Sequence, residues 1–264
     1  MARLTLPETY RSQVQHIQQS PKFQPRPEER GGGRITEPST SRGGRQAVPF
    51  PGYSAITPPE EEDSQNIGFY ENLNGCQQQL KQIPLNCDLI VPVPPASFHL
   101  TLADLIWDSA YRYANENSEF EVQLRSRVAN SFQQYRQSTT QTNPIRWQML
   151  GLLVMPRSVG VCLVPKDENS YEQIWKFRRT IYQNPGLTAL GIEQHYHFTA
   201  HITLGYFGDI SPNLDRDRLS ATFCELNQQW LDNCPELLVH RAELRKFDDM
   251  TRYYREPDWP VLDF

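Results

Sequence analysis

The sequence reads FHLTL at residues 98–102 and AHITL at residues 200–204, which are two copies of one short pattern. Side chains of a β-strand point alternately to opposite faces. In each copy, a His and a Thr two residues apart therefore share one face, and their apolar neighbours form the other. Each copy predicts a strand with a polar face and an apolar back.

One such strand could be an ordinary half-buried strand, but two copies in one chain favour a shared function. The chain has six histidines, and two of them fall in the same sequence frame. We therefore expect His99 and Thr101 to face His201 and Thr203 across a cleft. His suits proton transfer because its ordinary pKa of about 6.5 lies near neutral pH. The paired pattern indicates a two-histidine acid–base site whose hydroxyl groups bind an anion.

At these motifs the chain resembles the 2H phosphoesterase superfamily, the LigT-like proteins, which carry one His-x-Thr or His-x-Ser motif in each lobe of a duplicated α+β fold. The resemblance covers roughly residues 49–264 in layout. It implies a bilobed fold with two antiparallel sheets facing across a central cleft and helices on the outside. It also implies metal-independent phosphodiester chemistry, often on 2′,3′-cyclic phosphates or RNA ends, with His99, Thr101, His201 and Thr203 as catalytic residues.

The implied reaction needs one base and one acid. Water attacks the phosphorus of a cyclic phosphate, and a ribose oxygen leaves. One neutral His takes a proton from the water and one protonated His gives a proton to the leaving oxygen, if their surroundings separate their pKa values. The Thr hydroxyls hydrogen-bond the non-bridging phosphate oxygens, which stabilises charge without a metal. We expect no cofactor.

A metal site is the alternative suggested by residues upstream of the second motif. Alternation places His195 and His197 on the face of His201, and His-x-His is a known ligand spacing. At about 3.3 Å per residue, His195 and His197 lie about 6.6 Å apart, whereas His197 and His201 lie about 13 Å apart and cannot share an ion. No acidic residue stands in an obvious place for a third ligand. We therefore expect no metal, and we assign His197 to the polar rim of the cleft as a substrate contact.

Aromatic residues beside the motifs are the other candidate substrate contacts. Trp107 follows the first motif, and Tyr206 and Phe207 follow the second. A nucleobase stacked on such a ring gains about 1–3 kcal/mol, although ordinary packing explains these rings equally well. A nucleotide- or RNA-end-binding module without turnover is a further alternative. Such a module has no use for a paired acid and base.

Composition excludes some classes of partner. The chain has 264 residues and a formal net charge of −5, which argues against a protein that coats long duplex nucleic acid. Its five cysteines form no C-x-x-C pair and no zinc-like spacing, which favours reduced thiols in a cytoplasmic protein. The sequence has no secretory h-region and no apolar run of membrane-spanning length. We expect a monomer whose substrate is a small nucleotide or an RNA terminus.

The first 48 residues differ from the rest of the chain. They hold eight Lys or Arg against four Glu, with several prolines and runs of glycine. Such a segment buries too little to offset the entropy of ordering it. Residues 1–48 are therefore predicted to be a flexible tail, either simply solvated or an arm that holds substrate. Residues 49–264 are predicted to form the bilobed domain.

Residue periodicity predicts helices and strands in mixed order, which is typical of α+β lobes. A capping box from Ser118 to Glu121 is expected to start one helix, and Asn169 or Ser170 to cap the next. The predicted helices are 66–83, 108–137 in two pieces, about 170–183, and 219–230. The predicted strands are 53–57, 89–95, 97–102, a hairpin of 145–155 and 159–164, 195–206, 237–247 and 251–254.

Overall fold

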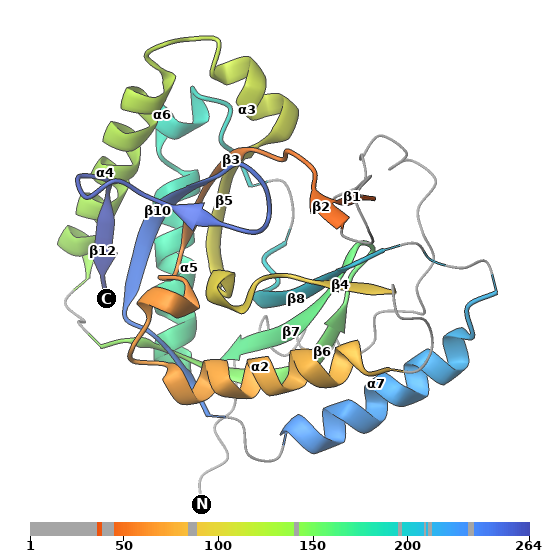
Figure 1. Ribbon diagram of the computed structural model, residues 1–264. Coiled ribbons are helices and arrows are strands. Elements are labelled where there is room, and N and C mark those ends of the chain that lie inside the picture. The colour runs from red at the N-terminus through yellow and green to blue at the C-terminus, as the bar shows by residue number, and fades with distance from the viewer. Residues whose placement is uncertain are drawn as a thin grey trace, which may run out of the picture.

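The computed structural model describes residues 36–38, 45–83, 89–139, 143–194, 197–208, 210, 213–231 and 235–264. This part of the chain forms two five-stranded antiparallel sheets and six α-helices, which confirms the α+β class (Figure 1). Most of the predicted tail, residues 1–48, lies outside the described residues. Within it, β1 (Thr36–Pro38) and β2 (Arg45–Ala47) pair with each other as a small antiparallel ribbon.

The first sheet draws its strands from both ends of the domain. Its order is β11-β10-β3-β5, and β12 also pairs with β10. β3 and β5 lie early in the described chain, whereas β10, β11 and β12 are its last strands. The bounds are β3 (Gly52–Ile56), β5 (Thr101–Trp107), β10 (Arg241–Phe247), β11 (Tyr253–Tyr254) and β12 (Val261–Asp263).

The second sheet is built mostly from the middle of the chain. Its order is β4-β8-β7-β6-β9. The predicted hairpin is confirmed, because β6 and β7 pair antiparallel along most of their length. β4 joins this sheet before the chain crosses to β5, and β9 joins it before the chain crosses to β10. The bounds are β4 (Ile90–Pro92), β6 (Ile145–Val154), β7 (Ser158–Pro165), β8 (His201–Phe207) and β9 (Leu237–Val239).

The helices lie outside the two sheets. α2 contacts β4 and β8, and α7 contacts β6, so both pack on the second sheet. α3 contacts β5 and α4 contacts β12, while α5 contacts strands of both sheets and so ties the lobes together (Figure 1). The bounds are α2 (Ile67–Lys81), α3 (Asp108–Ala114), α4 (Phe120–Ser138), α5 (Glu168–Tyr182), α6 (Pro185–Thr188) and α7 (Arg216–Leu231).

Two predicted helix caps are wrong. α4 begins at Phe120 with no side-chain cap, and in the preceding turn Asn117 rather than Ser118 accepts a hydrogen bond, from the Glu119 N–H at 3.0 Å. α5 is capped by Asp167, whose carboxylate accepts the Ser170 N–H at 2.8 Å. Local spacing alone does not reveal which of several neighbouring polar residues turns toward the helix end.

Both motif strands begin later in the sequence than predicted. η2, a 3-10 turn at Pro95–Ser97, precedes the first motif, so β5 begins at Thr101 and His99 lies in the extended approach to it. β8 begins at His201 rather than at residue 195. None of the described helices combines the length and apolar character needed to span a bilayer. Cys162 and Cys224 are free thiols, whereas Cys87 and Cys234 lie outside the described residues.

Candidate active site

A cavity of about 450 Å³ lies between the two sheets and brings the two motifs together. His99 and Thr101 line it from the first sheet, and His201 and Thr203 line it from the second. The apolar residues of both motifs are at most 5% exposed and belong to one hydrophobic core. Each motif therefore turns its apolar side chains into the core, while its His and Thr line the cavity.

Both histidines are held by the same kind of hydrogen bond. His99 Nδ1 lies 2.7 Å from the carbonyl oxygen of Ser97, and His201 Nδ1 lies 2.8 Å from that of Thr199. A carbonyl oxygen can only accept, so Nδ1 of each ring carries the hydrogen and donates it. This contact fixes the tautomer and leaves Nε2 of each ring as the nitrogen available to a bound molecule.

The two imidazoles differ in electrostatic surroundings. The pKa of His99 is lowered to about 4, chiefly by burial and also by the nearby His201 and Arg245, against a rise from the carbonyl of Ser97. The Tyr253 ring packs against His99, with ring centroids 4.0 Å apart. His99 is therefore neutral across the physiological pH range.

A short segment before α2 holds the approach to β5 in place. Thr57 exchanges two hydrogen bonds with Leu100, because its N–H donates to the carbonyl of Leu100 and its Oγ1 accepts the Leu100 N–H, both at 3.0 Å. The Glu60 N–H donates to the carbonyl of Phe98 at 2.8 Å. Both neighbours of His99 are thus bonded to residues 57–60, which compensates for the absence of strand pairing at His99 itself.

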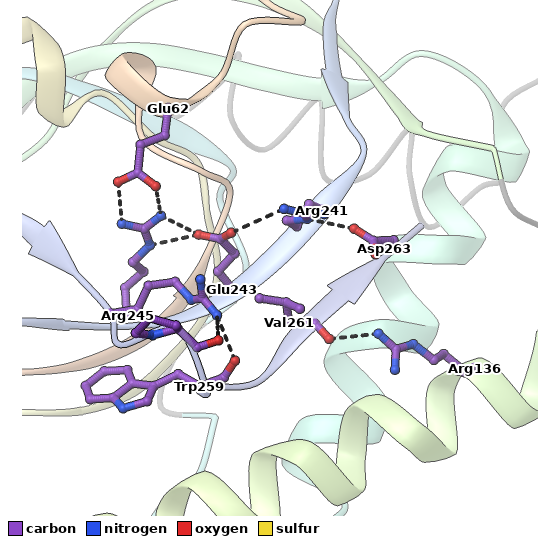
Figure 2. Close-up of polar contacts among 10 residues, drawn as sticks. Glu62, Arg136, Arg241, Glu243, Arg245, Trp259, Val261 and Asp263 are labelled. Carbon is purple, nitrogen blue, oxygen red and sulfur yellow. Dashed lines mark hydrogen bonds and ion pairs between the residues drawn. The ribbon is translucent and has the colours of Figure 1, made fainter.

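A buried ion network anchors the same segment to the first sheet (Figure 2). Arg245 of β10 is 2% exposed and lies between two carboxylates. It binds Glu62 of η1 (Glu60–Glu62) through both terminal nitrogens, at 2.8 and 2.5 Å, and it also binds Glu243. Arg245 further donates to the carbonyl of Tyr253 at 3.2 Å. One cation therefore links η1, β10 and the strand that carries the ring packed on His99.

The remaining predicted contacts divide between cavity and surroundings. Trp107 and Tyr206 line the cavity, and burial raises the pKa of the Tyr206 hydroxyl to about 12. Phe207 packs against the hydrophobic core and is not among the lining residues. His197 is exposed and does not line the cavity, because β8 begins downstream of it and strand alternation does not extend that far.

No metal-binding cluster of three or more His, Cys, Asp or Glu side chains occurs within the described ranges. His195, which the metal alternative requires, lies outside them. Upstream of β8 both Phe198 and Thr199 line the cavity, so the predicted strand face is lost there. Of the predicted shared face, His201 lines the cavity and His197 does not, so these two residues do not share a face as predicted.

Several cavity residues escaped the sequence analysis because they come from distant segments. Arg157 lies in the turn between β6 and β7, and its sequence context indicates only a hairpin. Asp104 lies three residues after Thr101, at a bulge between β3 and β5 that breaks simple alternation. The other such residues that line the cavity are Phe50, Ser54, Val93, Phe247, Met250 and Tyr253.

Comparison with known proteins supports the fold. No protein-family model and no curated protein matches the chain. Among solved structures, a conserved protein of unknown function from Agrobacterium tumefaciens is similar over 80% of this chain and 86% of its own, with 16% identity and a TM-score of 0.57. At this identity the similarity shows the fold alone.

Weaker similarities exist to two further structures. E. coli LigT complexed with 3′-AMP has 15% identity and a TM-score of 0.41, over 81% of this chain and 98% of its own. A protein of Thermus thermophilus has 18% identity and a TM-score of 0.41, over 80% of this chain and 92% of its own. TM-scores this low carry no argument about the site.

Proposed function

We propose that this protein is a metal-independent phosphodiesterase that opens a 2′,3′-cyclic phosphate on a nucleotide or an RNA end. The observation that carries the proposal is the matched pair of imidazoles in one cavity. Each ring is fixed through Nδ1 by a carbonyl oxygen two residues upstream, each leaves Nε2 available, and each has a Thr beside it.

In the proposed reaction, His99 is the base and His201 is the acid. His99 Nε2 accepts a proton from water as the water oxygen attacks phosphorus. The bond from phosphorus to one ribose oxygen breaks, and His201 Nε2 donates a proton to that oxygen. The lowered pKa of His99 supports this assignment, since a base must be neutral before it can act.

Thr101 and Thr203 are assigned to the phosphate oxygens that do not react. They lack a useful proton-transfer pKa, but a hydroxyl can donate to a non-bridging oxygen and hold phosphorus between the two rings. The structurally similar proteins include E. coli LigT and a phosphoesterase. The proposal depends on the geometry of this chain, and not on those names.

The decisive test is a turnover screen in EDTA. The substrates are 2′,3′-cyclic mononucleotides and RNA oligonucleotides with a terminal cyclic phosphate. We expect turnover by the wild type, and a loss of at least about 10²-fold in kcat for His99→Ala and for His201→Ala, each with an unchanged circular dichroism spectrum.

His240→Ala is the matched control for this test. His240 Nδ1 also faces a carbonyl two residues upstream, that of Leu238 at 3.4 Å, but His240 does not line the cavity. We expect it to keep wild-type turnover. Binding without any turnover would instead support the binding-module alternative, and turnover lost only in EDTA would support the metal hydrolase.

A further inference from the structure

The charged side chains of the cavity are distributed unevenly between its two walls. Arg157 is the one Lys or Arg among the described residues that line the cavity, and it belongs to the wall formed by the second sheet. The carboxylate of Asp104 lies on β5, in the wall formed by the first sheet. If an anionic ligand extends beyond the histidines, its further negative charge is attracted toward Arg157 and repelled by Asp104.

The backbone of Arg157 is fixed beside the end of β8. Its carbonyl oxygen accepts the Phe207 N–H at 2.8 Å, and the next residue, Ser158, pairs with Tyr206. Another hydrogen bond, from the Met155 N–H to the carbonyl of Ser158 at 2.9 Å, closes the turn. Arg157 is thus presented on the same strand pair that carries His201 and Thr203.

The guanidinium of Arg157 is exposed and has no hydrogen-bond or ion-pair partner among the described residues. The other arginine close to the histidines, Arg245, is already bound to two carboxylates. A guanidinium presents a planar set of donors that matches two phosphate oxygens at once. Arg157 is therefore the cation that remains available to a ligand.

The size of the cavity sets which phosphate Arg157 can meet. A cavity of about 450 Å³ lies within the range of small-molecule sites and is suited to a single nucleotide. When the cyclic phosphate of a terminal nucleotide lies between the histidines, the rest of an RNA chain leaves through the mouth. The first phosphate on that path is the 5′-phosphate of the same nucleotide.

We propose that Arg157 binds the 5′-phosphate of the terminal nucleotide, so that the preferred substrates are 5′-phosphorylated cyclic nucleotides and RNA ends. This inference rests on the proposed function and selects among its substrates. A nucleoside cyclic phosphate without a 5′-phosphate makes no contact with Arg157. Charge-assisted contacts of this kind raise affinity by about 10-fold or more.

Calorimetric binding separates this inference from catalysis. The probes are adenosine 3′-monophosphate and adenosine 3′,5′-bisphosphate, which differ only in the 5′-phosphate, each titrated into the full chain in EDTA. We expect the wild type to bind the bisphosphate about 10-fold more tightly than the monophosphate. Arg157→Ala should bring the ratio of the two affinities close to one, and Arg157→Lys should keep part of the preference, since it keeps the charge but not the planar fork.

Arg216→Ala is the control, because it removes the same charge from the exposed surface of α7, away from the cavity. It should keep the wild-type ratio. A wild-type ratio near one, or a ratio unchanged in Arg157→Ala, overturns the role of Arg157. The absence of turnover on cyclic phosphates would overturn the proposed function. The two affinity ratios would still test the role of Arg157, because they are measured by binding alone.

Discussion

His99 and His201 are held in the same way but stand in different surroundings. A carbonyl oxygen two residues upstream orients each ring. Burial and the nearby buried Arg245 lower the pKa of His99, and the ring of Tyr253 packs on its face. One duplicated motif can therefore supply two chemically different groups, because the residues around it are not duplicated.

This difference predicts the pH dependence of the reaction. A base works only when neutral, so kcat/KM falls as pH drops through the pKa of the base. That pKa is about 4 for His99, against the ordinary value of about 6.5. We expect the acidic limb of kcat/KM to have its midpoint near pH 4, measured on a cyclic-phosphate substrate.

The Glu62→Gln variant provides a second test of the pH dependence. It removes one of the two carboxylates that neutralise Arg245, so the cation acts more strongly on His99 and its pKa falls. The acidic limb should move to lower pH, whereas His240→Ala should leave it in place. A wild-type limb near pH 6.5 would show that His99 is not the base.

The two threonines can be tested without removing a ring. Thr→Val keeps the branched shape and nearly the same volume, so the strand is retained and only the hydroxyl is lost. Loss of a hydrogen bond to a charged group costs about 1.5–3 kcal/mol, or about 10- to 150-fold in kcat/KM. Thr101→Val and Thr203→Val should each fall in this range, which is a smaller loss than removal of the adjacent His.

The pH optimum of both Thr→Val variants should stay nearly unchanged, because no titrating group is removed. Thr222→Val on the outer helix α7 is the control, since the hydroxyl of Thr222 bonds only to a helix carbonyl in that surface turn. If both cavity variants have wild-type kcat/KM, the hydroxyls do not hold the phosphate and the assignment of Thr101 and Thr203 is wrong.

Among the elements, the close spacing of β7 and β8 positions His201 and Thr203, the half of the candidate site on the second sheet. Gly160 of β7 pairs with Thr203, and the register between the two strands shifts at this point. A Cβ added at Gly160 would lie 2.3 Å from the carbonyl oxygen of Ile202. Only glycine permits this approach, and the carbonyl concerned lies between His201 and Thr203.

Gly160→Ala should therefore damage both stability and catalysis. The added methyl forces β8 away from β7, and overpacking of this kind costs about 1–3 kcal/mol. We expect a lower Tm in thermal unfolding, and a fall in kcat because His201 and Thr203 move together. Gly68→Ala is the contrasting variant, since its Cβ meets only ordinary contact and α2 gains a better helix former.

Features that depend on neighbouring residues could be predicted from the sequence. The buried face of α4, formed by Phe120, Leu124, Val128, Phe132 and Tyr135, follows directly from helical spacing. The polar faces of the two motifs follow from strand alternation in the same way. The helix caps could not be predicted, because tertiary contacts decide which of several adjacent polar residues turns toward the helix end. The start of β8 could not be predicted either, because it depends on where pairing with β7 begins.

The rest of the candidate site depends on contacts between distant segments. Tyr253 packs on His99 although the two are far apart in the chain, and Arg245 reaches Glu62 through the buried network. Neither residue belongs to a recognisable motif. A single sequence therefore predicts the candidate His and Thr pairs, whereas the residues that surround and hold them appear only in the structure.

For the whole molecule, we predict that the N-terminal tail is dispensable for folding. Residues 1–48 offer little apolar surface, and tolerance to truncation depends on burial rather than on position. Removal of residues 1–48 retains Phe50, which lines the cavity and whose N–H bonds to the carbonyl of Asp248 at 2.8 Å. The melting temperature should stay within a few degrees of that of the full chain, and aggregation would show that the tail packs as part of the fold.

The interleaved path of the chain also sets the order in which the protein is completed during synthesis. β6, β7 and β8 are neighbours both in sequence and in the second sheet, so they can pair while the ribosome is still translating. β3 can pair early with β5 on one side, but its neighbour on the other side, β10, emerges much later. A nascent chain carries His99 from an early stage but lacks Arg245 and Tyr253. On the proposed function, we therefore expect a nascent chain to lack turnover until β10 and β11 have emerged and packed beside His99.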